Sequence, residues 1–584
     1  MMKVIIINMK LINQNDYDNT VYITKTNKED YKDSLHTTIK SSGCGICCGM
    51  MVADFFNMPI SMDEAIKLAY DYKANTSSGT KYKEYANALK DRLDLTISRT
   101  DNKEDLFKCL DNGGCAVANV GGDHNAHLGI FSNVGHYIFI ASHNNDKLRI
   151  YDPGLTIDKY EVEYRKDKVV VENDYLYSDI NTLLKDMENR ESCIFLFNKR
   201  KESSSYESIF NRIDKLYPSF INIWKDVVLI DSPTEYKEGV DKVGKYFIDK
   251  AARNMWDIEI QENEKAGNAI CITMNSNSND KPVCISGHMD TVHPIGSIKT
   301  YIEKDIMYGP GCTDCKGGLV ACLLAMQALK DEGYINRPVK FILQSDEEVG
   351  SKLSNKETIK FMIDKSKDAI CFINNEMHMD STVVTTRKGI SRYTMIIHGK
   401  SVHASIVEGG ASAILEASKK IVELEKMKHP DGITINVGTI KGGTTPNTVP
   451  DECSFEIDVR FNDENEYTQA NKYIEEIADK VFVKGTSTEL KEVGKRIAMD
   501  HKDYNDVLVN KINAIFKECG LKELKQRKAS GGSDGAYTSG ANIPTIDSIG
   551  VEGGYIHSKK EYAYLESLKD SAKRIAAIIY GIKQ

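Results

Sequence analysis

Short apolar runs that stop at a histidine or a carboxylate recur in the second half of the chain. Residues 283–285 are apolar, and His288 and Asp290 follow almost at once. A parallel strand buried on both faces has this continuous apolar pattern, bounded by turn residues. In open α/β sheets the ligand lies just beyond the carboxyl ends of such strands. The pattern therefore predicts a buried strand that places His288 at the functional edge of a sheet, with Asp290 as a hydrogen-bond partner for its second ring nitrogen.

Two more apolar runs end in the same way: residues 339–344 before Glu347 and Glu348, and 369–373 before Glu376. Near the end of the chain, a further strand expected at 544–549 is followed by His557. A glycine-rich loop that contains Asp314 opens an apolar helix predicted over residues 319–330. Carboxylates repeatedly placed at strand ends repel one another unless a cation lies between them. The pattern therefore indicates a metal centre built from distant parts of the chain.

The expected ligands are two histidines and three carboxylates, without clustered thiolates. Zinc is the expected ion, with cobalt and manganese as alternatives. One bridging carboxylate would hold two ions about 3.5–4 Å apart, an arrangement that activates a water molecule between them. Glu347 and Glu348 are adjacent, so both cannot face the ions from an extended segment. One of them would be a ligand and the other a general base.

These segments carry a close resemblance to a known family. Ser-Gly-His-Met-Asp-Thr-Val, Gly-Cys-Thr-Asp-Cys-Lys-Gly-Gly, Ser-Asp-Glu-Glu-Val-Gly-Ser and Gly-Gly-Ser-Asp-Gly-Ala resemble the aminoacylase, glutamate carboxypeptidase and acetylornithine/succinyl-diaminopimelate deacylase family of dinuclear zinc enzymes, across residues 208–584. The resemblance implies the following roles: Asp314 bridges the metals, His288 and Glu376 hold one, Glu348 and His557 hold the other, Glu347 is the base, and Asp290 orients His288.

Residues 388–495 form an insertion between these motifs. Their pattern predicts strand, helix, two strands, helix and strand, the split βαββαβ order. In the family such an insertion is a lid that also forms a homodimer. The resemblance implies that His403, Asn447 and Arg460 contact the substrate. From the sequence alone, His403 is equally consistent with an exposed loop residue.

A different pattern, in the first 200 residues, places a cysteine at the predicted start of a helix. Gly43-Cys44-Gly45 precedes the apolar residues 46–53. A helix N-terminus lowers a cysteine pKa and favours the nucleophilic thiolate. Such a nucleophile needs a base and an orienting group. His136 begins one predicted strand and Asp152 ends the next, so antiparallel pairing would bring them side by side.

The segments Gly-Cys-Gly, Gly-His-Tyr and Tyr-Asp-Pro-Gly resemble the papain-fold cysteine peptidases of the bacteriocin leader-processing type, over most of residues 30–155. The resemblance implies Cys44 as nucleophile, His136 as base and Asp152 as orienting residue. Members often carry a glutamine shortly before the cysteine as an oxyanion donor. Here the nearest upstream glutamine is Gln14, so either another group is the donor or the site is impaired.

Other interpretations of this region stay open. Cys44 and Cys47 have the spacing of a redox pair, and the cysteines also suit the core of a non-catalytic binding module. His124, His127 and His143 are expected to be loop residues. Farther along the chain, Cys312 and Cys315 are expected to be structural, Asp534 to lie in a loop or substrate site, and His293 to lie on the surface.

The length of 584 residues exceeds what one hydrophobic core supports. We expect an α/β and α+β protein with a papain-like domain at 1–200, an α/β zinc-peptidase domain at 208–387 and 496–584, and a ferredoxin-like lid at 388–495. A charged and serine-rich segment, 198–205, is the expected linker, and residues 1–10 are expected to form a first strand. The net charge of −9 argues against nucleic acid as a partner. Fourteen cysteines without an export signal or a membrane span indicate the cytoplasm.

The sequence thus predicts a two-metal amide hydrolase for a small peptide or an N-acyl amino acid, fused to a cysteine peptidase-like domain. Two alternatives concern the first domain. It would be a binding module without catalysis, or it would cut or transfer an acyl group through a Cys44 thioester before metal-dependent trimming.

Overall fold

A computed structural model describes residues 9–22, 38–76, 79–190, 194–199, 205–406, 408–429 and 431–583. The first strand expected at 1–10 and the linker expected at 198–205 lie largely outside these residues. The chain divides into two compact units, one of residues 1–203 with 249–256 and one of residues 204–248 with 257–584. Within the described residues, no helix has both the length and the apolar character needed to span a membrane.

The first unit is built on an antiparallel sheet of seven strands. In spatial order they are β3 (Leu95–Thr100), β9 (Ile194–Lys199), β4 (Cys115–Val120), β5 (His136–Asn144), β6 (Lys147–Tyr151), β8 (Tyr175–Asp179) and β7 (Val169–Glu172). Its helices are α1 (Ile39–Ser42), α2 (Cys44–Phe55), α3 (Met62–Asp71), α4 (Tyr82–Leu93), α5 (Lys103–Asp111), α6 (Glu163–Lys166) and α7 (Ile180–Asp186). The predicted helix after Cys44 is therefore present as α2, which packs against β5.

Short elements complete this unit. They are the 3-10 helix η1 (Gln14–Asp16) and the two-stranded sheet of β1 (Asn75–Thr76) and β2 (Gly79–Thr80). Every α2 residue from Gly45 to Ala53 is buried, because the apolar segment faces the sheet on one side and α3 and α4 on the other. This burial fixes the N-terminal end of α2, where Cys44 lies.

The second unit contains a mixed sheet of eight strands. In spatial order they are β10 (Asp257–Gln261), β11 (Ala269–Met274), β15 (Val339–Gln344), β12 (Val283–His288), β16 (Cys371–Asn374), β23 (Thr545–Asp547), β17 (Thr382–Arg387) and β22 (Lys525–Ala529). The central strands β15, β12, β16 and β23 run parallel. They are the predicted apolar runs, and every residue of β12 is buried. Their carboxyl ends therefore meet at one edge of the sheet.

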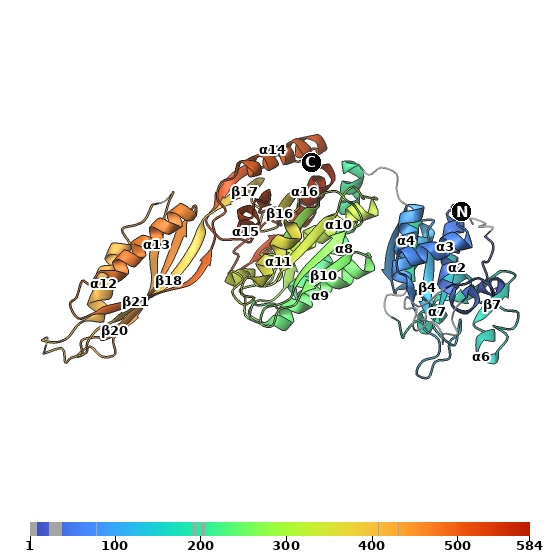
Figure 1. Ribbon diagram of the computed structural model, residues 1–584, viewed down its shortest axis with the longest axis horizontal. Helices are drawn as coiled ribbons and strands as arrows, with labels where there is room; N and C mark the ends of the chain where they lie inside the picture. The colour runs from blue at the N-terminus through green and yellow to red at the C-terminus, as the bar shows by residue number, and fades with distance from the viewer. Residues whose placement is uncertain are drawn as a thin grey trace. The chain divides into compact units, whose positions relative to one another are not determined.

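Helices pack around this sheet (Figure 1). They are α8 (Tyr206–Val228), α9 (Lys237–Arg253), α10 (Lys316–Asp331), α11 (Glu357–Ser366), α14 (Asp503–Cys519), α15 (Gly535–Gly540) and α16 (Ser567–Gly581), with the 3-10 helix η3 (Glu347–Val349) after β15. Helix α10 is buried nearly all round, as its apolar sequence predicts, because it packs against α8, α16 and β12.

A small sheet carries two loops that matter below. Its strands are β13 (Tyr301–Glu303), β14 (Ile306–Tyr308), β25 (Tyr562–Tyr564) and β24 (Gly553–Gly554). The loop after β14 contains Asp314, and the loop between β24 and β25 contains His557. Because β14 pairs with β25, the sheet holds both loops side by side.

The inserted segment follows the predicted order of elements. These are β18 (Gly389–His398), α12 (Ala413–Leu424), β19 (Thr434–Gly442), β20 (Glu452–Phe461), α13 (Glu464–Asp479) and β21 (Ser487–Arg496). The strands form an antiparallel sheet in the order β19-β20-β18-β21, and both helices pack against it (Figure 1). The segment has its own core of apolar side chains.

Candidate metal and cysteine sites

The carboxyl ends of the central parallel strands bring four of the predicted side chains together. His288 is the last residue of β12 and lies beside Gln344, the last residue of β15. Glu347 and Glu348 follow β15 within η3, and Glu376 lies two residues after β16. Because neighbouring parallel strands end at the same edge, residues separated by almost 90 positions become neighbours.

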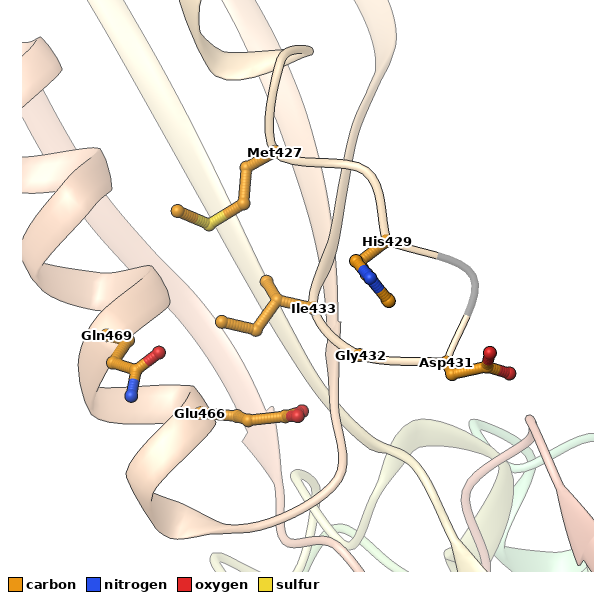
Figure 2. A pocket seen from close by; sticks show the side chains of 7 residues that line it. All are labelled: Met427, His429, Asp431, Gly432, Ile433, Glu466 and Gln469. Atoms are coloured by element: carbon orange, nitrogen blue, oxygen red, sulfur yellow. The ribbon is translucent and has the colours of Figure 1, made fainter.

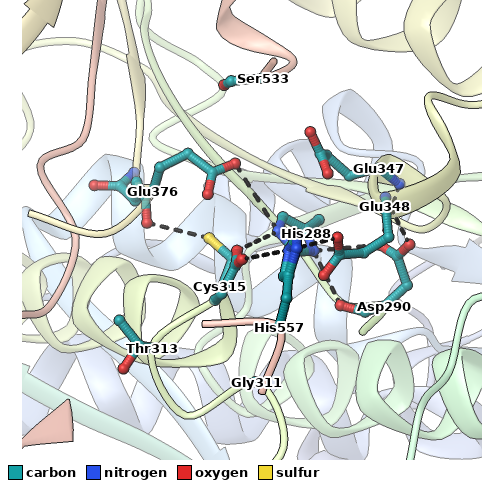
Figure 3. A network of polar contacts seen from close by, with 12 residues as sticks. His288, Asp290, Gly311, Thr313, Cys315, Glu347, Glu348, Glu376, Ser533 and His557 are labelled. Atoms are coloured by element: carbon teal, nitrogen blue, oxygen red, sulfur yellow. Dashed lines mark hydrogen bonds and ion pairs between the residues drawn. The ribbon is translucent and has the colours of Figure 1, made fainter. Parts of the chain in front are cut away.

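Asp314 lies at the centre of this cluster. Its Oδ1 is 3.1 Å from His288 Nε2, and its Oδ2 is 3.1 Å from His557 Nε2. His557 Nε2 also lies 3.1 Å from Glu348 Oε2, and His288 Nε2 lies 3.9 Å from Glu376 Oε1 (Figure 3). Each oxygen of one carboxylate therefore faces a different imidazole, and each imidazole faces a further glutamate.

The cluster concentrates negative charge in a buried place. Burial, together with the nearby Asp314 and Glu347 carboxylates, raises the pKa of Glu376 well above its usual range. Burial also raises the pKa of Glu348 to about 7, with a contribution from Asp314, although a hydrogen bond with His557 opposes the rise. Carboxylates held this close are costly unless cations compensate them.

The donor set fits a pair of divalent cations. Imidazole nitrogens and carboxylate oxygens in this number suit zinc, and cobalt and manganese accept the same ligands. A carboxylate with one oxygen toward each histidine has the form of a bridging ligand. Two thiols in the neighbourhood make contacts of their own, because Cys312 donates to Met307 O and Cys315 donates to Asn375 O.

Asp290 organises the turn that carries the two adjacent glutamates. Its side chain lies 3.3 Å from His288 Nδ1, and it accepts hydrogen bonds from the backbone N–H groups of Glu347 and Glu348. The Thr234 hydroxyl donates to it at 2.8 Å. The position is the one predicted for Asp290, beside the second ring nitrogen of His288.

The Asp314 loop is fixed by Glu561, a residue that the sequence analysis missed. This buried carboxylate accepts hydrogen bonds from the backbone N–H groups of Gly311, Thr313 and Asp314 at 2.9–3.0 Å, and His293 Nε2 lies 2.9 Å from its Oε2. His293 was expected on the surface, and that prediction was wrong, because His293 is buried against Glu561.

Glu347 points toward a different partner from Glu348. Arg496, the last residue of β21, lies 2.5 Å from Glu347 Oε1 and also donates to the Glu347 carbonyl oxygen. The sequence analysis missed Arg496, since nothing in the pattern of a strand end singles out this arginine. Close by, Asp534 is buried, and neither of its side-chain oxygens has a hydrogen-bond partner among the residues that the structure describes.

The predicted residues of the inserted segment do not join this cluster. His403 pairs through its ring with the Ser405 hydroxyl, and Asn447 accepts a hydrogen bond from the Ala404 backbone. Arg460 pairs with Asp458 and donates to Ser530 O. Among the contacts of the described residues, none links His403, Asn447 or Arg460 to His288 or its carboxylate neighbours.

A separate cavity lies on the inserted segment (Figure 2). Its volume is about 380 Å³, and its lining residues are Met427, His429, Asp431, Gly432, Ile433, Glu466 and Gln469. None of them belongs to the metal-binding candidates, so this cavity is distinct from the cluster at the strand ends.

The first unit contains the predicted cysteine, histidine and aspartate in contact. Cys44 is the first residue of α2, His136 the first of β5, and Asp152 follows β6 directly. The Cys44 thiol lies close enough to the His136 imidazole for that ring to lower the thiol pKa, and His136 Nε2 lies 2.7 Å from Asp152 Oδ1. Burial raises the pKa of the Cys44 thiol, but the hydrogen bond and charge of His136 outweigh it, so the net pKa is lowered.

The other residues of this region take several positions. Cys47 and Cys48 are buried, and burial raises the pKa of both thiols. Gln14 lies beside the site, because its backbone N–H donates to Pro153 O and its amide donates to Lys40 O, four residues before Cys44. Of the three histidines expected in loops, His124 and His127 lie between β4 and β5 and contact Gly122 O and Asp186. The prediction was wrong for His143, which lies near the end of β5 and contacts Asp111.

Known proteins are similar to the second unit of the chain. Carboxypeptidase G2 from Pseudomonas sp. strain RS-16 is 26% identical over 378 residues, which cover 62% of this chain and 89% of that protein. Acetylornithine deacetylase from Myxococcus xanthus is 28% identical over 210 residues, covering 33% of this chain and 53% of that protein.

Solved structures and a family profile extend the comparison. A tripeptidase from Staphylococcus aureus has a TM-score of 0.53 at 25% identity, covering 62% of this chain and 97% of that one. The profile of peptidase family M20/M25/M40 matches residues 284–581, the range that contains His288, Asp314, Glu347, Glu348, Glu376 and His557. The match covers more than half of the chain, and with it the whole strand-end cluster: this chain belongs to peptidase family M20/M25/M40.

Proposed function

We propose that the second unit is a metal-dependent amide hydrolase that acts on a small peptide or an N-acyl amino acid. The observation that carries the proposal is the Asp314 carboxylate, which presents one oxygen to His288 and the other to His557. Relatives named as a carboxypeptidase, a desuccinylase and a deacetylase support an amide bond as the target. Zinc is the proposed ion, with cobalt or manganese as alternatives.

The chain would hold two ions with residues from five segments. Asp314 would bridge them, His288 and Glu376 would hold one, and Glu348 and His557 would hold the other. When bound, such ions supply Lewis acidity toward an amide carbonyl and toward a water molecule. Asp290 would fix the ring orientation of His288 and the position of η3.

Glu347 would act as the general base. It would accept the proton of the attacking water and return that proton to the leaving amine. In the present arrangement Arg496 pairs with its Oε1. For Glu347 to accept a proton, either Arg496 must move away from Oε1 or the proton must go to Oε2.

Replacement of Glu347 tests the assignment. We expect Glu347→Gln to retain the bound metal and to lose at least about 100-fold in kcat, the lower end of what general acid–base catalysis contributes. The measurements are metal content by mass spectrometry and hydrolysis of a panel of N-acyl amino acids and dipeptides. Glu303→Gln, on an exposed strand, is the matched control. Full turnover by Glu347→Gln, or wild-type protein without a stoichiometric divalent ion, would refute the proposal.

The inserted segment 388–495 would be a lid that also forms a homodimer. Helix α12 supports this proposal because it exposes Ile414, Leu415 and Val422. His403, Asn447 and Arg460 would reach substrate when the lid closes or when a second copy contributes them. A mass in solution equal to one chain would contradict the dimer, and Val422→Glu is expected to dissociate it.

The first unit would be a second, cysteine-dependent site. The contact of Cys44 with His136, and of His136 with Asp152, favours this over a non-catalytic binding module. The Cys44 thiolate would attack an amide carbonyl, and His136 would give its proton to the leaving amine. The resulting thioester would pass its acyl group to water or to another acceptor. Although Gln14 is far upstream of Cys44 in the sequence, it is a candidate donor to the oxyanion, because it contacts both Pro153 and Lys40.

Alkylation rates test the cysteine site. We expect iodoacetamide to modify Cys44 faster than the buried Cys47, because the Cys44 pKa is lowered and the Cys47 pKa is raised. Peptide mass spectrometry measures both rates in the full chain. Cys44→Ala should abolish thioester chemistry and leave metal-dependent hydrolysis intact. Equal and slow labelling of the two cysteines would favour the binding module, and loss of both activities would mean that the units share one reaction.

A further inference from the structure

Asp152 makes more hydrogen bonds than an orienting carboxylate needs. Its Oδ1 accepts from His136 Nε2 at 2.7 Å and from the Gly154 backbone at 2.8 Å. Its Oδ2 accepts from Lys159 Nζ and from the Tyr160 hydroxyl, both at 2.6 Å. In a nucleophile–histidine–carboxylate arrangement, the carboxylate holds the imidazole and stabilises its charged form. The lysine adds a positive charge that this role does not require.

The Lys159 ammonium lies beside the imidazole as well as beside the carboxylate. A Cβ atom placed on Gly154 would lie 3.2 Å from both His136 Cε1 and Lys159 Nζ, so the two side chains flank the same glycine. The Lys159 side chain is only 13% exposed and Asp152 is fully buried. Charges in such surroundings interact more strongly than charges in water.

Lys159 changes the charge balance of the site. A Cys44 thiolate, a His136 imidazolium, the Asp152 carboxylate and the Lys159 ammonium sum to zero. Without the lysine the sum is −1, and the carboxylate acts on the imidazolium alone. We propose that Lys159 is a positioning residue of the cysteine site, which fixes the Asp152 carboxylate and limits how tightly that carboxylate holds a proton on His136. This inference rests on the cysteine-dependent function proposed above.

The directions of the pKa shifts agree with this geometry. Burial and the Lys159 ammonium lower the pKa of His136, while the charge and hydrogen bond of Asp152 and the hydrogen bond with Cys44 raise it, to about 9 in total. The titratable and charged groups around His136 are Cys44 on α2, Asp152 after β6, Lys159 and Tyr160 in the following loop, and Arg190 beside Gly135. Removal of the lysine therefore raises the His136 pKa further.

The lysine has a consequence for the reaction. His136 must first accept a proton and then donate it to the leaving amine. A proton held too tightly is a poor one to donate, and general acid–base catalysis is most efficient when the pKa is near the working pH. Lys159 thus keeps the charged pair of Cys44 and His136 while making the imidazolium a better acid.

Two alkylating reagents of different charge measure the His136 pKa in the full chain. Iodoacetate is negatively charged and is favoured by an imidazolium next to Cys44, whereas iodoacetamide is neutral. The ratio of the iodoacetate rate to the iodoacetamide rate at Cys44 decreases as His136 loses its proton. The midpoint pH of this decrease therefore reports the His136 pKa. We expect Lys159→Met to raise the midpoint pH of this decrease by roughly one unit.

Two further variants separate charge from folding. Lys159→Arg keeps the positive charge, and Lys168→Met removes an exposed lysine of the same unit. Both variants are expected to keep the midpoint pH of the wild type. An unchanged midpoint pH in Lys159→Met, with Cys44 still selectively labelled, would overturn the role of Lys159. Absence of selective Cys44 labelling in the wild type would instead overturn the cysteine site itself.

Discussion

At the scale of single residues, the positions of the metal-binding candidates depend on two carboxylates that accept hydrogen bonds from backbone N–H groups. Glu561 accepts hydrogen bonds from three backbone N–H groups of the loop that presents Asp314, and it also pairs with His293. Asp290 does the same for the turn of Glu347 and Glu348. A ligand is only as well placed as the loop that carries it, so these acids determine the metal geometry indirectly.

Glu561→Gln tests this dependence. A glutamine of the same shape has an NH₂ group that faces backbone N–H donors, so the Asp314 loop loses part of its support. We expect metal affinity to fall by about 10–100-fold while the fold is retained. Competition with a chelator measures the affinity, and circular dichroism checks the fold. Unchanged affinity would show that the loop needs no carboxylate, and Glu303→Gln again serves as control.

Sequence patterns predicted the functional residues at strand ends but did not predict residues that are positioned by long-range contacts. His288, Glu348 and Glu376 follow apolar runs that predict parallel strands, and the geometry of a parallel sheet brings such ends together. Glu561 follows no such run. Glu561 reaches Gly311 across 250 positions, a contact that leaves no periodic trace along the chain. His293 was placed wrongly for the same reason, since its partner is Glu561.

At the scale of elements, the inserted segment was predicted in full order because its strands alternate and its helices have one apolar face. One contact between its helices was not predicted. Lys420 of α12 is completely buried and donates to Ile477 O, Ala478 O and Lys480 O at the end of α13. It also lies 3.2 Å from the buried Glu416. The ammonium therefore caps the C-terminus of α13, where positive charge is favourable.

Removal of this cap is expected to destabilise the inserted segment. Lys420→Met leaves three carbonyl groups without a donor and the Glu416 carboxylate without its cation. We expect the free energy of unfolding to fall by about 3 kcal/mol, in the range for breaking one half of a buried ion pair. Urea unfolding measures the change. The exposed neighbour Lys419→Met is the control and should leave the midpoint where it is. If Lys420→Met and Lys419→Met unfolded at the same urea concentration, the capping role of Lys420 would be contradicted.

At the scale of the whole molecule, the two proposed sites are built on different sheets of one chain. The cysteine site uses antiparallel β5 and β6, which bring His136 and Asp152 together across one hairpin. The metal-binding cluster uses parallel strands, and therefore needs residues from the whole length of the second unit. The pair of His136 and Asp152 was predicted from two consecutive strands. The strand-end residues were predicted because the apolar runs of β12, β15 and β16 stop at a histidine or a carboxylate, whereas Asp314 was predicted from its glycine-rich loop.

The chain enters and leaves the inserted segment at one place. Arg387 and Met499 exchange both backbone hydrogen bonds there, at 2.8 and 3.0 Å, and Arg496 stands three residues before Met499 with its guanidinium on Glu347. A tilt of the inserted segment about the Arg387–Met499 pair would move Arg496 relative to Glu347, the proposed general base. Ligand binding or substitutions in the part of the segment farthest from this pair would then alter turnover without any contact with the reacting bond.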